Sequence, residues 1–92
     1  MEKRKSRISR EEICRMFTEL AKSLALSTNL PYVVIRGKDV RKKLGLSSPI
    51  YIHIIKEEID KGNIKGVKYF VSGRFTRFKI ERDYWVREAN PT

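Results

Sequence analysis

Apolar side chains recur at helical spacing in the early part of the chain. Between residues 13 and 24 they form one continuous stripe, which predicts a core helix that runs to about Leu26. Ser9 stands before this stripe as a helix N-cap, and Glu12 follows three residues later, as in a capping box. This first helix is long and apolar enough to serve both the core and a contact between subunits.

The pattern then changes to a short strand and a second helix. The run "YVVI" at 32–35 is β-branched and aromatic, which predicts a short strand. A short helix should follow from about Lys38. Gly45 is expected to end it in the left-handed conformation, with Leu46 packing back against it.

A third helix is predicted over 49–61. Ser48 is a good N-cap, the proline at the next position suits the first helical turn, and Gly62 ends the helix. A rotation of about 100° per residue divides this helix into an apolar and a polar face. The predicted core face comprises Tyr51, Ile52, Ile55 and Ile59. The opposite face comprises His53, Lys56, Glu57 and Asp60.

Ile50 and Ile54 fall on the shoulder of this helix, one turn apart. They either pack at the edge of the core or make apolar contacts with thymine methyl groups or with a second subunit. The spacing leaves both interpretations open.

Two runs of strand-forming residues flank Ser72 and Gly73, which predicts a β-hairpin with a two-residue turn. In the expected register, the paired positions are Val71 with Arg74, Tyr69 with Thr76, and Val67 with Phe78. The predicted core side holds Val67, Tyr69, Val71, Phe78 and Ile80. The outer side holds Lys68, Phe70, Phe75, Arg77 and Lys79.

The predicted order is helix, short strand, helix, tight turn, helix and hairpin, which is the order of a winged helix-turn-helix domain. We therefore expect an α+β fold over residues 8–80, with three helices, a C-terminal hairpin wing and one short extra strand. The segment 81–92 is too short for a second unit. Its Tyr84 and Trp85 are expected either to pack on the core or to form a dimer contact.

The stretch "DVRKKLGLSSPIYIHIIKEEIDKGNI" resembles the helix-turn-helix core of archaeal and bacterial winged-helix regulators. The resemblance is carried by Val40, Leu44, the turn 45–49, Ile55, Lys61, Gly62 and Ile64. The sequence departs from the family pattern at Glu58, where an aliphatic residue is usual, and Ile59 is expected to take the inward place. The resemblance implies that helix 49–61 enters the DNA major groove while the hairpin contacts the backbone beside it.

Charge narrows the class of partner. The chain has 92 residues, enough for one domain, with 21 Lys and Arg against 11 Asp and Glu and a net charge of +10. Residues 1–7 contain a dense basic cluster and are expected to form a flexible arm. Such an excess attracts polyanions: DNA, RNA or an acidic membrane surface. The alternative is that the cations only keep the protein soluble, as in heat-adapted proteins.

Cysteine usage and hydropathy indicate where the chain acts. Cys14 is the single cysteine, so no intramolecular disulfide can form. No apolar run approaches the roughly 20 residues of a membrane span, and nothing resembles a signal peptide. We expect a cytoplasmic protein associated with the nucleoid.

Candidate DNA-binding residues fall into three groups. The bracing helix and its approach supply Lys38, Arg41 and Lys42, which would reach phosphates unless they form only a solvated face. The turn and the projecting helix supply Ser47, Ser48, Ile50, His53 and Lys56. The wing supplies Lys68, Arg74, Arg77 and Lys79. Helix N-terminal N–H groups favour a phosphate near the serines, and Arg74 is best placed for phosphate or minor-groove contact.

Nothing in the sequence predicts catalysis, so we expect no enzyme, no cofactor and no metal site. The leading hypothesis is a sequence-selective double-stranded DNA-binding homodimer that regulates transcription. One alternative is a DNA or RNA binder without sequence preference, acting in chromatin, replication or a ribonucleoprotein. Another is a winged-helix protein–protein interaction module.

Overall fold

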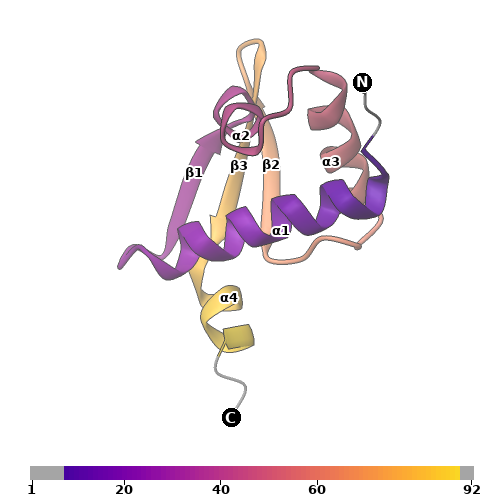
Figure 1. Ribbon diagram of the computed structural model, residues 1–92. Coiled ribbons are helices and arrows are strands. Elements are labelled where there is room, and N and C mark those ends of the chain that lie inside the picture. The colour runs from indigo at the N-terminus through magenta and orange to yellow at the C-terminus, as the bar shows by residue number, and fades with distance from the viewer. Residues whose placement is uncertain (1–7, 90–92) are drawn as a thin grey trace.

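The computed structural model describes residues 8–89, and within them it has four helices and one three-stranded antiparallel sheet (Figure 1). In chain order the elements are α1 (Arg10–Leu26), β1 (Tyr32–Arg36), α2 (Gly37–Leu44), α3 (Ile50–Asp60), β2 (Val67–Ser72), β3 (Phe75–Glu81) and α4 (Arg82–Ala89). The expected α+β class and the order of the first six elements are confirmed. The predicted basic arm, 1–7, lies outside the described residues.

Helix α1 forms where the apolar stripe predicts it. The Ser9 hydroxyl accepts a hydrogen bond from the Glu12 backbone N–H at 3.1 Å, which caps the helix. The side chains of Ile13, Phe17 and Ala21 are fully buried. Phe17 packs on Phe78 of β3, with ring centroids 5.1 Å apart, so α1 anchors the helical layer to the middle of the sheet.

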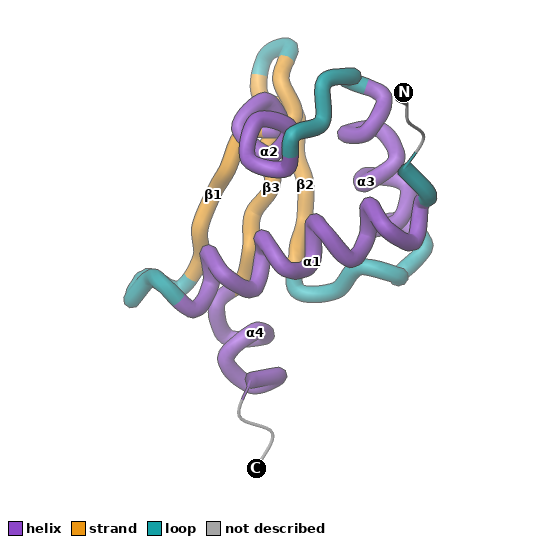
Figure 2. The backbone as a smooth tube through the Cα atoms, viewed as in Figure 1, coloured by secondary structure: helices purple, strands orange, loops and turns teal. Residues whose placement is uncertain are grey.

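The sheet has the strand order β1-β3-β2, so the short extra strand pairs with the second strand of the hairpin. Figures 1 and 2 show α1 crossing in front of the sheet, α2 seen end-on over its upper part, and α3 beside β2. Helix α4 follows β3 at the lower end. None of the helices within residues 8–89 covers the far face of the sheet.

The hairpin register differs from the prediction by two residues. Ser72 lies opposite Phe75, and Val71 pairs with Thr76, so Gly73 and Arg74 form the turn. Gly73 has φ 66°, a conformation that glycine adopts without steric cost at the first position of a hairpin turn. A shift of two residues leaves the faces as predicted, but it moves Val71 beyond the core, where it is 58% exposed instead of buried.

The turn between α2 and α3 contains the two sequence signals used to predict it, Gly45 and Ser48. Gly45 has φ 69°, and the Leu46 N–H donates to the Arg41 carbonyl at 2.8 Å while the Leu46 side chain is buried. The Ser48 hydroxyl then accepts from the Ile50 N–H at 3.3 Å. The predicted stop of α2 is confirmed, whereas α3 starts one residue later than predicted, at Ile50, with Pro49 and not Ser48 at the N-cap position.

The rotation of α3 differs from the prediction at one position. Glu58 is buried, and Ile59 is only partly buried against the core. Glu58 can face inward because its carboxylate accepts hydrogen bonds from Arg10 at 3.0 Å and Asn63 at 2.9 Å. The expectation that Ile59 replaces it in the inward place is therefore wrong.

Helix α4 was not predicted as a helix. Trp85 is buried, and its Nε1–H donates to the Gly66 carbonyl at 3.2 Å. Tyr84 packs edge-on against Trp85, with centroids 5.0 Å apart. Trp85 of this segment therefore packs on the core, and a dimer contact through the segment stays a prediction.

Candidate nucleic-acid interface

A groove of about 540 Å³ opens where the hairpin tip, the start of α2 and the start of α3 meet. Figure 1 places these three segments together at the upper end of the molecule. The groove is lined by Arg36, Gly37, Lys38, Arg41, Pro49, Ile52, His53, Lys56, Arg74, Phe75, Thr76 and Arg77. It is therefore built by residues from the end of β1, from α2, from the start of α3 and from the β2–β3 hairpin.

The three segments come together around Gly37, the first residue of α2. A Cβ at Gly37 would lie 3.4 Å from the Ile52 side chain and 3.4 Å from the Thr76 carbonyl oxygen. These are van der Waals contact distances, so the first turn of α2 lies directly against both α3 and β3. The pairing of β1 with β3 ends at the same level, with Arg36 opposite Arg77, so two guanidinium-bearing residues meet at the groove.

The groove is strongly cationic. Its six Lys and Arg side chains come from β1, α2, α3 and the hairpin, and none of its lining residues is Asp or Glu. Arg36 Nε donates to Asp39 Oδ2 at 3.0 Å, and this hydrogen bond lowers the pKa of the Asp39 carboxyl. A set of cations that line a concave surface focuses positive potential there, which attracts a polyanion.

Three of the side chains that line the groove also contact neighbouring residues of the same chain. Arg41 Nη1 donates to the Ser47 carbonyl at 2.8 Å, which ties the turn to α2. Lys56 Nζ lies 5.6 Å from the centroid of the Tyr69 ring. His53 Nε2 lies 3.3 Å from Glu57 Oε2 on the exposed side of α3. These three side chains are thus held by neighbours, which limits their freedom before any ligand arrives.

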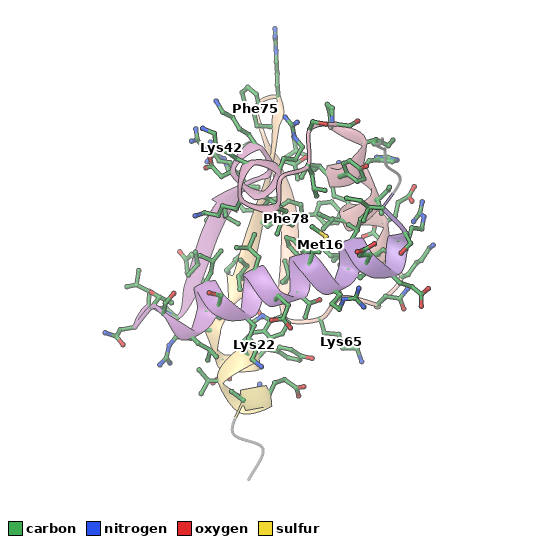
Figure 3. All side chains as sticks on the ribbon, viewed as in Figure 1. Met16, Lys22, Lys42, Lys65, Phe75 and Phe78 are labelled. Carbon is green, nitrogen blue, oxygen red and sulfur yellow. The ribbon has the colours of Figure 1, made fainter. Side chains whose placement is uncertain are left out.

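The structure brings together half of the predicted DNA-binding residues. Those that line the groove are Lys38, Arg41, His53, Lys56, Arg74 and Arg77. Ser47, Ser48 and Ile50 lie next to it in the turn and at the start of α3, and Ile50 is 54% exposed. Figure 3 shows Lys42 on α2 at the same end of the molecule as Phe75.

Lys68 and Lys79 do not belong to this groove. They are cross-strand partners on the outward face of the sheet. Arg36 and Phe75, by contrast, line the groove although Arg36 was not predicted as a site residue and Phe75 was assigned only to the outer face. The available signal was the basic residue directly before Gly37, at the point where the strand must turn into α2.

Comparisons with known proteins give no family for this chain. No family model matches it, and neither a curated protein nor a solved structure does. Within residues 8–89, no helix has the length and apolar character needed to cross a membrane. The same residues contain no cluster of three or more His, Cys, Asp or Glu side chains suited to a metal ion.

Proposed function

We propose that this chain is a winged helix-turn-helix protein that binds double-stranded DNA with sequence selectivity, as a homodimeric regulator of transcription. The observation that carries the proposal is the cationic groove between α3 and the hairpin, with its six Lys and Arg side chains. DNA presents a dense row of phosphates, and cations that neutralise them release counterions and gain affinity.

In this proposal α3 is the recognition helix. A major groove about 12 Å wide admits one helix. Ile50 and His53 are exposed at the start of α3, where the first turns of a recognition helix meet base edges. Ile50 would contact a thymine methyl group, and His53 would hydrogen-bond to a base edge.

The other cations would hold the duplex in register. Lys38 and Arg41 of α2 would contact phosphates on one side of α3, and Arg74 at the hairpin turn would contact the backbone or enter the minor groove on the other side. Contacts to phosphate carry no sequence information, so selectivity would come from α3. A homodimer would repeat these contacts on two half-sites about one helical turn apart.

Selection from a random duplex library, followed by a size measurement of the complex, tests the proposal. We expect enrichment of an inverted repeat and a complex with two protein chains. Enrichment of no sequence, with equal retention of RNA or single strands, would favour a binder without sequence preference. No retention by any nucleic acid at low salt would refute the proposal and favour a protein–protein interaction module. A duplex-binding protein of this kind would be cytoplasmic and associated with the nucleoid.

A further inference from the structure

The uncovered face of the sheet is unusual in its composition. Antiparallel sheets that are solvated on one face normally carry polar side chains there. Here Tyr32 and Val34 of β1 are 45% and 42% exposed, and Phe70 of β2 is 42% exposed. Phe75 of β3 is 62% exposed at the upper end of the same face. We call this surface, together with the lysines between these rings, the outer sheet face.

The register shows how rings and cations alternate on the outer sheet face. Val34, Lys79 and Lys68 form one row across the three strands. Arg36, Arg77 and Phe70 form the next row toward the hairpin tip. Tyr32 lies on the opposite side of the lysine row, paired with Glu81. The face thus presents a ring on either side of a band of positive charge.

Two contacts show how the cations are held. Lys79 Nζ lies 4.5 Å from the centroid of the Tyr32 ring, and Lys68 Nζ lies 3.6 Å from Glu81 Oε2. Glu81 is the single carboxylate among the strand residues, against Lys68, Lys79, Arg77 and Arg36. The face therefore keeps a positive excess even with its internal ion pair formed.

The charge argues for a polyanion and against a second copy of this chain. Two such faces packed together would bring the same cations opposite one another, which is destabilising. The rings argue for unpaired bases, because base–aromatic stacking needs an exposed ring and tolerates any sequence. An exposed set of rings beside lysines combines both requirements.

We infer that the outer sheet face binds unpaired nucleotides of a single-stranded nucleic acid, with bases stacked on Tyr32 and Phe70 and phosphates near Lys68 and Lys79. The outer sheet face adjoins the groove proposed for duplex DNA at Arg36, Phe75 and Arg77, but none of the four residues assigned to the single strand lines that groove. The inference stands on its own observations and does not require that the groove binds a duplex.

The test uses the full chain and three fluorescent probes: oligo(dT) and oligo(U) of about 12 nucleotides, and a duplex of about the same length. Anisotropy titrations at low salt compare wild type with Phe70→Leu, which keeps apolar volume but removes the ring. We expect about a 5- to 100-fold loss of oligo(dT) affinity in the variant, with unchanged duplex affinity. If oligo(U) binds as tightly as oligo(dT), the site accepts RNA as well as DNA. If oligo(U) binds more weakly, the site prefers DNA.

Two control variants separate the two surfaces. Val71→Ala alters the neighbouring residue, which is 58% exposed but faces the other side of the hairpin, and should leave oligo(dT) affinity unchanged. Lys38→Ala alters the groove and should weaken duplex binding only. Circular dichroism of each variant verifies that the fold is retained, and Tyr32→Leu repeats the ring test on a different strand if Phe70→Leu does not fold.

The results of these titrations distinguish a failure of this inference from a failure of the proposed function. If the duplex binds but oligo(dT) does not, the inference is overturned and the proposed function stands. A second outcome is that oligo(dT) binds Phe70→Leu as tightly as wild type but binds Lys38→Ala more weakly than wild type. The single strand then occupies the groove, and the inference is again overturned. If oligo(dT) binding requires Phe70 while no duplex binds, the inference holds and the proposed function fails. Phe70-dependent binding to vesicles of equal phosphatidylglycerol and phosphatidylcholine, without oligo(dT) binding, would assign the face to a membrane and overturn the inference.

Discussion

Arg10 Nη1 donates a hydrogen bond to Glu58 Oε2 at 3.0 Å, across 48 positions of the chain. Arg10 begins α1, and Glu58 lies on the buried side of α3. Asn63 and Lys61 donate to the same carboxylate at 2.9 Å and 3.3 Å. The proposed recognition helix is therefore fixed to the core helix by one satisfied carboxylate, and we call these four residues the Glu58 cluster.

The Glu58 cluster predicts a dependence of stability on pH. Hydrogen bonding, first from Asn63 and then from Arg10, lowers the pKa of Glu58 from its ordinary 4.5 to about 2. Because the folded pKa lies below the unfolded one, the stabilisation is complete above the unfolded value and is lost as pH falls toward 2. We expect Glu58→Gln to unfold at lower urea concentration at neutral pH, and to lose less further stability between pH 5 and pH 2 than wild type.

Urea unfolding at a series of pH values checks this prediction. Glu19→Gln, an exposed change on α1, is the matched control, and its stability should fall with acid as that of wild type does. Some pH dependence will remain in Glu58→Gln, because hydrogen bonds from Arg10 and Arg36 also lower the pKa values of Glu57 and Asp39. The same loss of stability with acid in wild type and Glu58→Gln would contradict the assignment to Glu58.

Gly66 gives a second stability prediction. It has φ 75°, and a Cβ there would lie 2.8 Å from Trp85 Nε1 and overlap the Tyr84 ring. We expect Gly66→Ala to lower the free energy of unfolding by about 2–4 kcal/mol, from backbone strain and overpacking together. Gly73→Ala is the matched control: its φ is 66° but nothing lies within 4 Å, so the free energy of unfolding should fall by only about 1–2 kcal/mol. Urea unfolding followed by Trp85 fluorescence measures both, and equal decreases would contradict the role of the α4 packing.

Local signals in the sequence predicted α2, α3 and the short turn between them, because the ends of these elements are fixed by neighbouring residues. The left-handed Gly45 and the hydrogen bond from the Ile50 N–H to the Ser48 hydroxyl need no distant partner. Glu58 was assigned wrongly for the opposite reason: its burial depends on donors from α1 and from the loop after α3, which helical spacing does not reveal. The register of the hairpin was missed because a shift of two residues preserves the alternation of its faces.

Only part of the candidate site could be predicted from the sequence, because the site depends on which segments the fold brings together. Twelve residues were expected from three separate segments, and the groove unites six of them where the first turn of α2 comes close to Ile52 and Thr76. Lys68 and Lys79 carry the same charge as the groove residues, but β1 joins the hairpin as a third strand and makes their face a broad surface of its own. Composition cannot distinguish two adjoining basic surfaces that only the fold defines.

Salt dependence tests the role proposed for the wing. Six to ten phosphates neutralised over two subunits should reduce duplex affinity by about 10³–10⁵ between 50 and 200 mM salt. Arg74→Ala should weaken binding to all duplexes alike and reduce the slope of log affinity against log salt by about 1 for each phosphate that Arg74 neutralises. Arg87→Ala, at an exposed position on α4 away from the groove, is the matched control. If the slope of log affinity against log salt is the same in Arg74→Ala and wild type, Arg74 at the hairpin turn does not contact a phosphate.

His53 separates base contacts from backbone contacts. Its ring lies 3.3 Å from Glu57, which also accepts a hydrogen bond from Arg10 at 2.6 Å, so His53→Ala should leave the fold intact. Because His53 is exposed at the start of α3, we expect its removal to change which duplex sequence is enriched in selection, while the salt slope stays within about 1 of wild type. Arg74→Ala in the same selection should enrich the wild-type sequence. If the two variants enrich the same sequence, the proposal that α3 contacts bases while the hairpin contacts phosphates is contradicted. Loss of a base contact changes the preferred sequence, whereas loss of a phosphate contact lowers the affinity for every sequence.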